Sequence, residues 1–250
     1  MDNQKEREFL IRDKYDGNAD ADLSKDLARL ENGEPLAYVI GWVPFLGLQV
    51  SLDSRPLIPR PETESWTEDL HTRLTEKFGD SPFTFLDLCA GSGAIGLSVL
   101  ARFPLARVRF AELVSAHCDQ IRRNIEENAL DVSRATVHIG DLFDAFPKDQ
   151  CFDVIATNPP YVPETRALDA SVTDFEPKVA LYAGNDGLDL IRRIAAEAAE
   201  RLEDNGELWM ECDIDNIEEA KGLLLTHGAK ETTIRNDVYG RPRVCVGYYP

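Results

Sequence analysis

Residues 87–96 read Asp87-Leu88-Cys89-Ala90-Gly91-Ser92-Gly93-Ala94-Ile95-Gly96. An apolar run over residues 83–88 leads into this stretch and predicts a buried strand, and residues 94–103 predict a helix. Glycines allow the backbone to approach a ligand closely, and the N-terminus of a helix offers free N–H groups. The stretch therefore predicts a strand, a ligand-binding loop and a helix, which is the opening unit of an α/β fold.

The same alternation continues on both sides of this loop. Apolar periodicity predicts helices at residues 64–78, 116–128, 188–202 and 217–227, and strands at 107–113, 136–139, 152–156, 207–211 and 244–248. Strands that alternate with helices through short connections favour a mostly parallel, doubly wound sheet. Ligands bind beyond the carboxyl ends of such strands, so we expect chemistry in the loops after Leu88, Phe110, Ile139 and Ala156.

The front of the chain has a different texture. Residues 5–31 predict one or two short helices that end at Asn32-Gly33. Residues 35–57, rich in aromatic and branched side chains, predict a β-hairpin or short strands. Residues 56–61 contain three prolines and predict a stiff connector. The expected division is a short N-terminal helical segment (1–32), a hairpin with a Pro-rich connector (33–60) and the main α/β domain (61–250).

Composition and charge exclude several classes of protein. Of 250 residues, 43% are hydrophobic and 29% charged, as in an ordinary globular protein. The net charge of −18 opposes a broad electrostatic grip on nucleic acid. Five cysteines without a CxxC pair and four scattered histidines predict no disulfide framework and no metal site. With neither a signal peptide nor an apolar run that could span a membrane, we expect a cytoplasmic protein, by default a monomer.

Two cofactor classes fit the glycine loop. Its Gly-x-Gly-x-x-Gly spacing matches the dinucleotide fingerprint, and Glu112, about 20 residues further on, is placed to bind ribose hydroxyls. Asp87 separates the classes, because a carboxylate beside the loop repels a pyrophosphate and attracts the ammonium and sulfonium charges of S-adenosylmethionine. The alternative is that Asp87 only caps the turn. After the third strand, Asp141 is expected to accept a hydrogen bond from an adenine amino group, with Leu142 or Phe143 against the ring.

The fourth strand of this pattern ends in Asn158-Pro159-Pro160-Tyr161. The prolines remove two N–H donors and stiffen the backbone. Asn158 supplies a side-chain carbonyl, and Tyr161 supplies a flat apolar wall with a polar tip. A planar NH2 group has two donor hydrogens, and Asn158 Oδ1 and the Pro159 carbonyl can hold one each. The motif predicts methylation of an amide or aromatic amine by alignment, with no general base needed before transfer.

In order and spacing, six segments resemble the N5-glutamine methyltransferases of the HemK/PrmC type, which modify peptide-chain release factors. The resemblance covers roughly residues 33–250. Asn-Pro-Pro-Tyr is shared with amino-group DNA methyltransferases, whereas the Pro-Arg-Pro-Glu-Thr-Glu and Glu-Pro…Ala-Leu blocks single out the glutamine family. The segments are Gly33-Glu-Pro-Leu-Ala-Tyr38-Val-Ile-Gly41, Leu57-Ile-Pro-Arg-Pro-Glu-Thr-Glu64, Leu86-Asp-Leu-Cys-Ala-Gly-Ser-Gly93, Asn158-Pro-Pro-Tyr161, Phe175-Glu-Pro-Lys-Val-Ala-Leu181 and Asp186-Gly-Leu-Asp189.

The resemblance implies a fold, a reaction and a site. The fold is that of a class I S-adenosylmethionine-dependent methyltransferase, with a Rossmann-like, mostly parallel seven-stranded sheet. The substrate is the glutamine of the Gly-Gly-Gln loop of a release factor, and the products are S-adenosylhomocysteine and N5-methylglutamine. The residues expected to hold the glutamine are Asn158, Pro159, Pro160 and Tyr161. Those expected at the cofactor are Asp87, Cys89, Ala90, Gly91, Ser92, Gly93, Glu112, Asp141, Leu142 and Asn158.

The sequence departs from the family pattern in three places. Cys89 stands where many members have glycine, and we interpret it as an inert packed thiol. The segment that begins at Glu211 lacks the family's Glu-Ile-Gly. Only 32 residues precede Gly33, where the family usually carries a longer helical domain that helps to grip the release factor. Recognition of the partner is then either reduced or taken over by the hairpin around residues 42–48.

Four alternatives remain to be weighed. A ribosomal protein could be the glutamine substrate, with the same site residues. An amino-group DNA or RNA methyltransferase needs a basic channel and a base-flipping pocket, which the charge disfavours. A catalytically silent relative is disfavoured by the intact motifs, and a dehydrogenase is excluded because this chain lacks a second α/β half.

Arg60, Glu62 and Glu64 either contact the ligand or cap the helix that follows them.

Overall fold

The computed structural model describes residues 3–250, so the first two residues of the expected segment 1–32 lie outside the described residues. A seven-stranded sheet in the order β5-β4-β3-β6-β7-β9-β8 forms the main body. Strands β5 to β7 in this order are parallel, and β9 and β8 are antiparallel to their neighbours. The strands are β3 (Phe83–Leu88), β4 (Ala106–Glu112), β5 (Ala135–Ile139), β6 (Phe152–Thr157), β7 (Leu202–Glu211), β8 (Glu231–Asn236) and β9 (Pro242–Tyr248).

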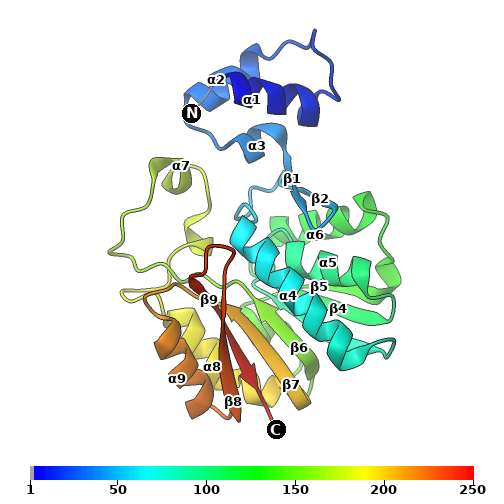
Figure 1. Ribbon diagram of the computed structural model, residues 1–250, viewed down its shortest axis with the longest axis vertical. Coiled ribbons are helices and arrows are strands. Elements are labelled where there is room, and N and C mark those ends of the chain that lie inside the picture. The colour runs from blue at the N-terminus through cyan, green and yellow to red at the C-terminus, as the bar shows by residue number, and fades with distance from the viewer. Residues whose placement is uncertain (1–2) are drawn as a thin grey trace.

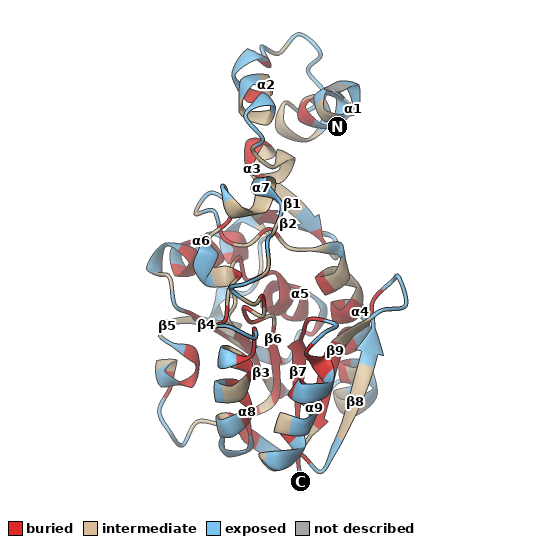
Figure 2. Cartoon of the chain, turned by 90° about the vertical axis from the view of Figure 1, so that its left-hand side faces the viewer, coloured by how far each residue is buried: buried red, intermediate tan, exposed pale blue. Residues whose placement is uncertain are grey.

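Helices cover both faces of this sheet (Figure 1). Side chains of α4 (Pro61–Phe78), α5 (Ala94–Arg102) and α6 (Ser115–Glu127) share one hydrophobic core with the sheet. Side chains of α8 (Asp189–Arg201) and α9 (Ile217–Thr226) share the second core on the opposite face. The central strands are therefore buried on both sides (Figure 2), as the near-continuous apolar runs of a parallel sheet require.

The expected α/β architecture is confirmed, and α4 and β8 show where it differs in detail. Helix α4 begins at Pro61 and not at Glu64, since proline fits the first turn of a helix, where its missing N–H has no intrahelical partner. Strand β8 was not expected. It is polar, with the sequence Glu-Thr-Thr-Ile-Arg-Asn, and it lies at the edge of the sheet, where one side of the strand needs no apolar surface.

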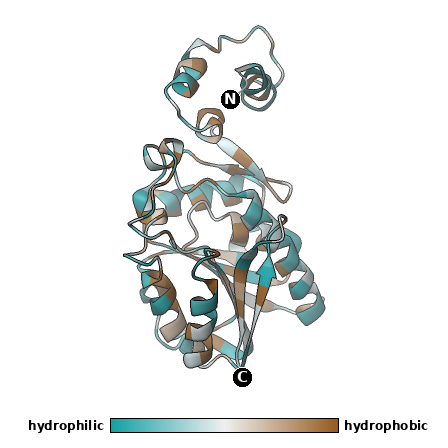
Figure 3. Cartoon of the chain, turned by 60° about the vertical axis from the view of Figure 1, so that its left-hand side comes forward, coloured by the Kyte–Doolittle hydropathy of each residue, from teal (hydrophilic) through white to brown (hydrophobic). Residues whose placement is uncertain are grey.

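A small helical unit precedes the body and stands above it in Figure 1. It contains α1 (Asn3–Phe9), a π-helical turn η1 (Leu10–Lys14), α2 (Ser24–Glu31) and α3 (Leu36–Ile40). Its own core is formed by Leu10, Leu23 and Val39. The buried carboxylate of Asp26 accepts hydrogen bonds from Lys14 Nζ and Tyr15 Oη, both at 2.8 Å. Helix α1 presents mainly hydrophilic residues beside the N-terminus in Figure 3.

The expectation of strands over residues 35–57 is correct for the hairpin and wrong for α3. The hairpin pairs β1 (Trp42–Phe45) with β2 (Leu48–Ser51). Residues 36–40 are helical because Pro35 precedes the helix, Gly41 ends it with φ at 101°, and Val39 packs into the N-terminal core. Because α3 shares that core, we propose Gly41 as the boundary of the helical unit. The connector was expected over residues 56–61; residues 56–60 contain no helix or strand, as expected, whereas Pro61 is the first residue of α4.

Candidate active site

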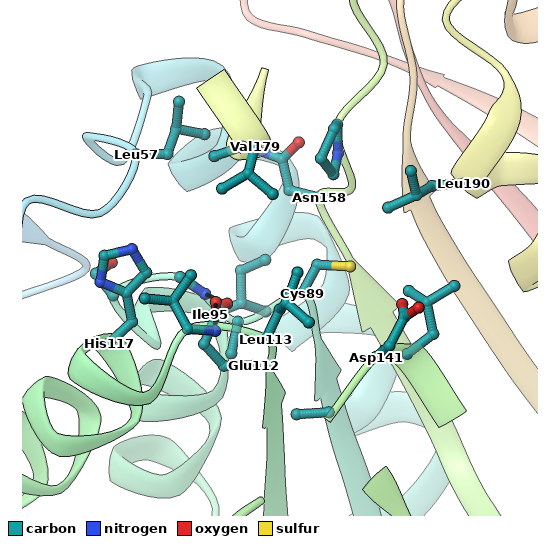
Figure 4. A pocket seen from close by; sticks show the side chains of 18 of the residues that line it. Leu57, Cys89, Ile95, Glu112, Leu113, His117, Asp141, Asn158, Val179 and Leu190 are labelled. Atoms are coloured by element: carbon teal, nitrogen blue, oxygen red, sulfur yellow. Dashed lines mark hydrogen bonds between the residues drawn. The ribbon is translucent and has the colours of Figure 1, made fainter. Parts of the chain in front are cut away.

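A cavity of about 270 Å³ opens beyond the carboxyl ends of the parallel strands. The loops after β3, β4, β5 and β6 all contribute to its wall, as the position of the sheet's carboxyl edge predicts. Figure 4 shows Glu112 and Asp141 on one side of the cavity, with Asn158 and Val179 across from them. The expected site residues that line it are Cys89, Ala90, Gly91, Ser92, Glu112, Asp141, Leu142, Asn158 and Pro160.

The glycine loop is held in place by Glu112. Gly91 and Gly93 adopt positive φ values of 55° and 83°, which glycine adopts without strain. The N–H groups of Gly91 and Val114 donate to Glu112 Oε2 and Oε1, each at 2.8 Å. This carboxylate therefore ties the loop after β3 to the end of β4, and it also lines the cavity. Gly93 is the residue directly before α5 and does not itself line the cavity.

Asp87 lies beneath the loop and does not line the cavity. Its side chain is fully buried, and Oδ2 accepts a hydrogen bond of 2.8 Å from the N–H of Gly96 in the first turn of α5. Its other oxygen, Oδ1, has no partner among the described residues. Burial raises the pKa of Asp87 well above its ordinary range. Asp87 therefore caps the helix, and its contact with a cofactor stays a prediction.

Asp141 and Leu142 follow β5 on the other side of the cavity. Asp141 Oδ2 accepts a hydrogen bond of 2.9 Å from Arg193 Nη2 of α8, and Leu142 is buried with φ at 50°. Cys89 lies in the same wall, and burial raises the pKa of its thiol to about 12. A thiol with that pKa stays protonated at neutral pH, which agrees with the interpretation of Cys89 as an inert packed group.

The Asn-Pro-Pro-Tyr motif splits into residues that face the cavity and residues behind it. Asn158 and Pro160 line the cavity, whereas Pro159 and Tyr161 do not. Asn158 Nδ2 donates to Thr63 Oγ1 at 3.2 Å. Tyr161 Oη donates to Glu211 Oε1 at 2.9 Å, and burial raises the pKa of Tyr161 well above its ordinary range. The tyrosine is anchored behind the cavity wall.

Sequence reasoning missed two residues that support this motif, Thr63 and Glu211. Glu211 ends β7 with 1% of its surface exposed, and its Oε2 accepts hydrogen bonds of 2.7 Å from Thr63 Oγ1 and from Trp66 Nε1. Thr63 also lines the cavity. For Glu211 the signal was present in the sequence. Glu211 stands at the carboxyl end of a predicted strand, and the same criterion located the other loops of the site.

The charged residues at the end of the connector and in the first turn of α4 bind other protein groups. Arg60 Nη2 pairs with the buried carboxylate of Glu176. Glu62 Oε1 pairs with Arg241 at 3.1 Å, and Glu64 Oε1 accepts a hydrogen bond of 2.6 Å from the N–H of Leu46. None of these three charged side chains lines the cavity, whereas their neighbours do: Leu57, Pro59 and Thr63.

A segment that we name the strap, residues 175–182, closes one side of the cavity. Val179, Ala180 and Tyr182 of the strap line the cavity. Glu176 Oε2 accepts a hydrogen bond of 3.1 Å from the N–H of Ile58, in addition to the Arg60 pair. One buried carboxylate therefore fastens the strap to the connector. The cavity is also lined by residues that were not expected, among them His117, Leu190 and Arg193.

The chain is similar in sequence to a known family and to several curated proteins. Residues 67–175 match the family described as the methyltransferase small domain. A release factor glutamine methyltransferase from Bordetella pertussis is 37% identical over 222 residues, which cover 88% of this chain and 80% of the relative. One of the same name from Rhodopirellula baltica is 33% identical over 220 residues, covering 86% and 74%. One from Lactococcus lactis is 32% identical over 240 residues, covering 94% and 85%.

Solved structures share the fold at lower identity. A methyltransferase from Pyrococcus furiosus superposes with a TM-score of 0.58 at 16% identity, covering 90% of this chain and 98% of that one. A 16S rRNA N2 G1207 methyltransferase from T. thermophilus, in complex with AdoMet and guanosine, superposes with a TM-score of 0.56 at 21% identity. The match covers 84% of this chain and 50% of that one. No helix within residues 3–250 is long and apolar enough to cross a membrane. With its site at the sheet edge and relatives above 30% identity over most of both chains, the chain belongs to the release factor glutamine methyltransferase family.

Proposed function

We propose that the protein methylates the side-chain amide nitrogen (N5) of the glutamine in the Gly-Gly-Gln loop of a peptide-chain release factor. Membership of the family supports this reaction. The observation that carries it is the orientation of Asn158 at the cavity, where Thr63 occupies its NH2 group and leaves the carbonyl oxygen without a partner among the described residues. A carbonyl in this position binds an NH2 group and disfavours a carboxylate or phosphate.

The chemistry of the cavity wall suits S-adenosylmethionine. Apolar side chains such as Ile95 and Leu142 dominate the wall, and the carboxylates of Glu112 and Asp141 come from neighbouring strand ends. The one guanidinium among the described lining residues, Arg193, is paired with Asp141, so no free cation is present there for a pyrophosphate. We assign the ribose to Glu112, the adenine to Asp141 and Leu142, and the amino-acid end to the loop over residues 89–93. S-Adenosylmethionine supplies the methyl group at this site.

The residues of the chain act by alignment. An amide nitrogen is a weak nucleophile because its lone pair is delocalised. We assign one N–H of the glutamine to Asn158 Oδ1, which faces the cavity, and the other to the carbonyl of Pro159, which does not line the cavity itself but stands between the lining residues Asn158 and Pro160. These two acceptors would fix the direction of the nitrogen and stabilise the positive charge that develops on it. The two prolines keep this backbone stiff. No residue needs to remove a proton before the transfer.

A glutamine of a ribosomal protein is the second candidate substrate, because it would use the same site. The net charge of −18 disfavours DNA or RNA as the substrate. We further propose that the protein acts in the cytoplasm as a monomer.

Intact-mass analysis tests the proposal directly. A release factor is incubated with the protein and S-adenosylmethionine, and the same factor with its loop glutamine replaced by alanine serves as the control. We expect the mass of the release factor that keeps its glutamine to rise by one methylene, and the mass of the alanine control to stay the same. With the Asn158→Ala protein, neither factor should gain mass. Binding of the cofactor without any mass gain would contradict the release-factor assignment and direct the search to ribosomal proteins.

A further inference from the structure

A chain of hydrogen bonds, which we call the relay, runs from the buried end of β7 to the motif that follows β6. Glu211 Oε2 accepts a hydrogen bond of 2.7 Å from the hydroxyl of Thr63, and Thr63 Oγ1 accepts one of 3.2 Å from Asn158 Nδ2. We propose that Glu211 is a positioning residue that sets the orientation of the Asn158 amide through Thr63. This inference rests on the proposed function of Asn158. It adds that Glu211 determines whether the carbonyl oxygen or the NH2 group of Asn158 faces the substrate.

The direction of the relay follows from the chemistry of its members. Glu211 Oε2 already accepts a hydrogen bond from Trp66 Nε1, which is a donor only, and it accepts a second one from the single hydroxyl hydrogen of Thr63. With that proton committed, the threonine oxygen toward Asn158 can only accept. Asn158 must then present its NH2 group to Thr63, which leaves Oδ1 as its unpaired group beside the cavity.

Reversal of this relay would present the wrong group to the substrate. If Thr63 had no acceptor behind it, its hydroxyl would donate to Asn158 Oδ1, and the amide would turn. The NH2 group of Asn158 would then meet the NH2 group of the glutamine, which places donors against donors. Because a small misplacement at a reacting centre costs up to about 100-fold in rate, the orientation of this one amide is a sizeable part of catalysis.

Trp66 and Tyr161 fix Glu211 itself. Trp66 Nε1 is a donor only and bonds to the same oxygen, Oε2, as Thr63, while Tyr161 bonds to Oε1 at 2.9 Å. A glutamine at position 211 must therefore turn its carbonyl toward Trp66 and Thr63, and its NH2 group can donate to the Tyr161 oxygen. Glutamine keeps the relay intact without the charge. Methionine has a similar length and no strong acceptor, so it removes the relay.

These properties define a matched set of variants. We expect Glu211→Met to lower the single-turnover rate of methyl transfer by about 10- to 100-fold while the affinity for S-adenosylmethionine stays unchanged. Glu211→Gln should restore most of that rate. Thr63→Val should reproduce the loss while the carboxylate of Glu211 stays in place with its donors Trp66 and Tyr161. Thr63→Ser should restore most of the rate, and the double variant Glu211→Met/Thr63→Val should be no slower than either single variant.

Glu207 provides the control on the same strand. It is equally buried, at 1% exposure, and it pairs with Arg73 and Lys77 away from the cavity. Glu207→Met removes a buried carboxylate in the same way, so it reports the cost of that change to stability alone. We expect it to lower the midpoint of unfolding and to leave the rate at saturating substrate unchanged.

A spectroscopic readout keeps this test separate from that of the release-factor assignment. The side-chain amide resonance of Asn158, assigned by its loss in Asn158→Asp, should shift in Glu211→Met and Thr63→Val, and not in Glu207→Met. If the wild type does not methylate a release factor but these shifts occur, the relay holds and the proposed substrate is wrong. Wild-type rates in both Glu211→Met and Thr63→Val, or an unmoved Asn158 resonance, would overturn the relay.

Discussion

Replacement of Gly96 by alanine tests why the third glycine of the loop is required. Gly96 lies in the first turn of α5, where a methyl group would overlap Phe110 Cε1 and lie 2.9 Å from Phe110 Cζ and 3.0 Å from Asp87 Cβ. Both neighbours are fully buried. Because the methyl group is enclosed from two sides, neither side chain can move away into free space. We expect Gly96→Ala to destabilise the protein.

A second helical glycine, Gly222, allows the free-energy cost of this clash to be separated from the effect of helix propensity. Alanine is favoured over glycine inside a helix by about 1 kcal/mol. Gly222 lies in α9, where a methyl group would meet no other atom within 4 Å, so Gly222→Ala gains this free energy without a clash. Gly96→Ala gains it as well and adds the overpacking cost, about 1–3 kcal/mol. The difference between the two variants therefore isolates that cost.

Urea denaturation of the wild type and both variants gives the free energies of unfolding. The expected order of stability is Gly222→Ala above the wild type and Gly96→Ala lowest. Calorimetric titration should also show weaker binding of S-adenosylmethionine to Gly96→Ala, because Phe110 lies two residues before Glu112 on β4 and Asp87 caps α5. The reasoning is refuted if Gly96→Ala is as stable as Gly222→Ala.

Two further predictions concern buried carboxylates. Glu176→Gln loses the ion pair with Arg60 that fastens the strap, so the affinity for S-adenosylmethionine should fall by about 10-fold with little change in unfolding; an unchanged dissociation constant by calorimetry would contradict this role. For Asp87, burial raises the folded-state pKa above the unfolded one, so its contribution to stability is fully present below the ordinary pKa of about 4 and is lost as the pH rises through the raised pKa. The wild type should therefore lose stability relative to Asp87→Asn with increasing pH in thermal unfolding, and a pH-independent difference would count against it.

The fold was predictable because its local signals agree. Phe83–Leu88 has the apolar run and the glycine turn of a buried parallel strand, and the structure has β3 over those residues. The signals failed where long-range packing decides. Residues 36–40 have the composition of a strand, yet Val39 packs with Leu10 and Leu23 and the segment is helical. The polar edge strand β8 carries no apolar alternation, so its pairing with β9 was not visible in the sequence.

The cavity wall was predictable where residues are close in sequence to a strand end. Glu112 and Asp141 lie in or directly after β4 and β5, and both line the cavity. Residues that reach the cavity from elsewhere were not predictable from spacing. Thr63 approaches Asn158 across 95 positions of sequence, and the strap residue Val179 lies in a short 3-10 helix, η4 (Lys178–Ala180), and not in a loop that follows a strand of the sheet. Nothing in local composition states that such distant residues meet.

The hidden carboxylates at the strand ends share one physical task. Asp87 accepts the N–H of Gly96, Glu112 accepts those of Gly91 and Val114, and Glu211 accepts the hydroxyl of Thr63. The partners of Asp87 and Glu112 are backbone N–H groups, which can only donate, so these two acids decide where the loops are held. The partner of Glu211 is a hydroxyl that can donate or accept, so there the acid also decides the direction of the hydrogen bond. The loops and helix starts at the carboxyl edge contain backbone N–H groups and hydroxyls that, without these acids, could form hydrogen bonds with other acceptors.

This task explains why the acids are buried in spite of the cost of desolvation. A carboxylate accepts at both oxygens, whereas a neutral amide keeps its carbonyl in place only where a donor-only group holds it, as Trp66 Nε1 does at position 211. The cost of burying Glu211 is offset by three donors at 2.7 to 2.9 Å, whereas Asp87 keeps one oxygen without a partner. We therefore expect carboxylate burial to stabilise the arrangement at Glu211 and to be tolerated at Asp87 for the sake of the loop that it holds.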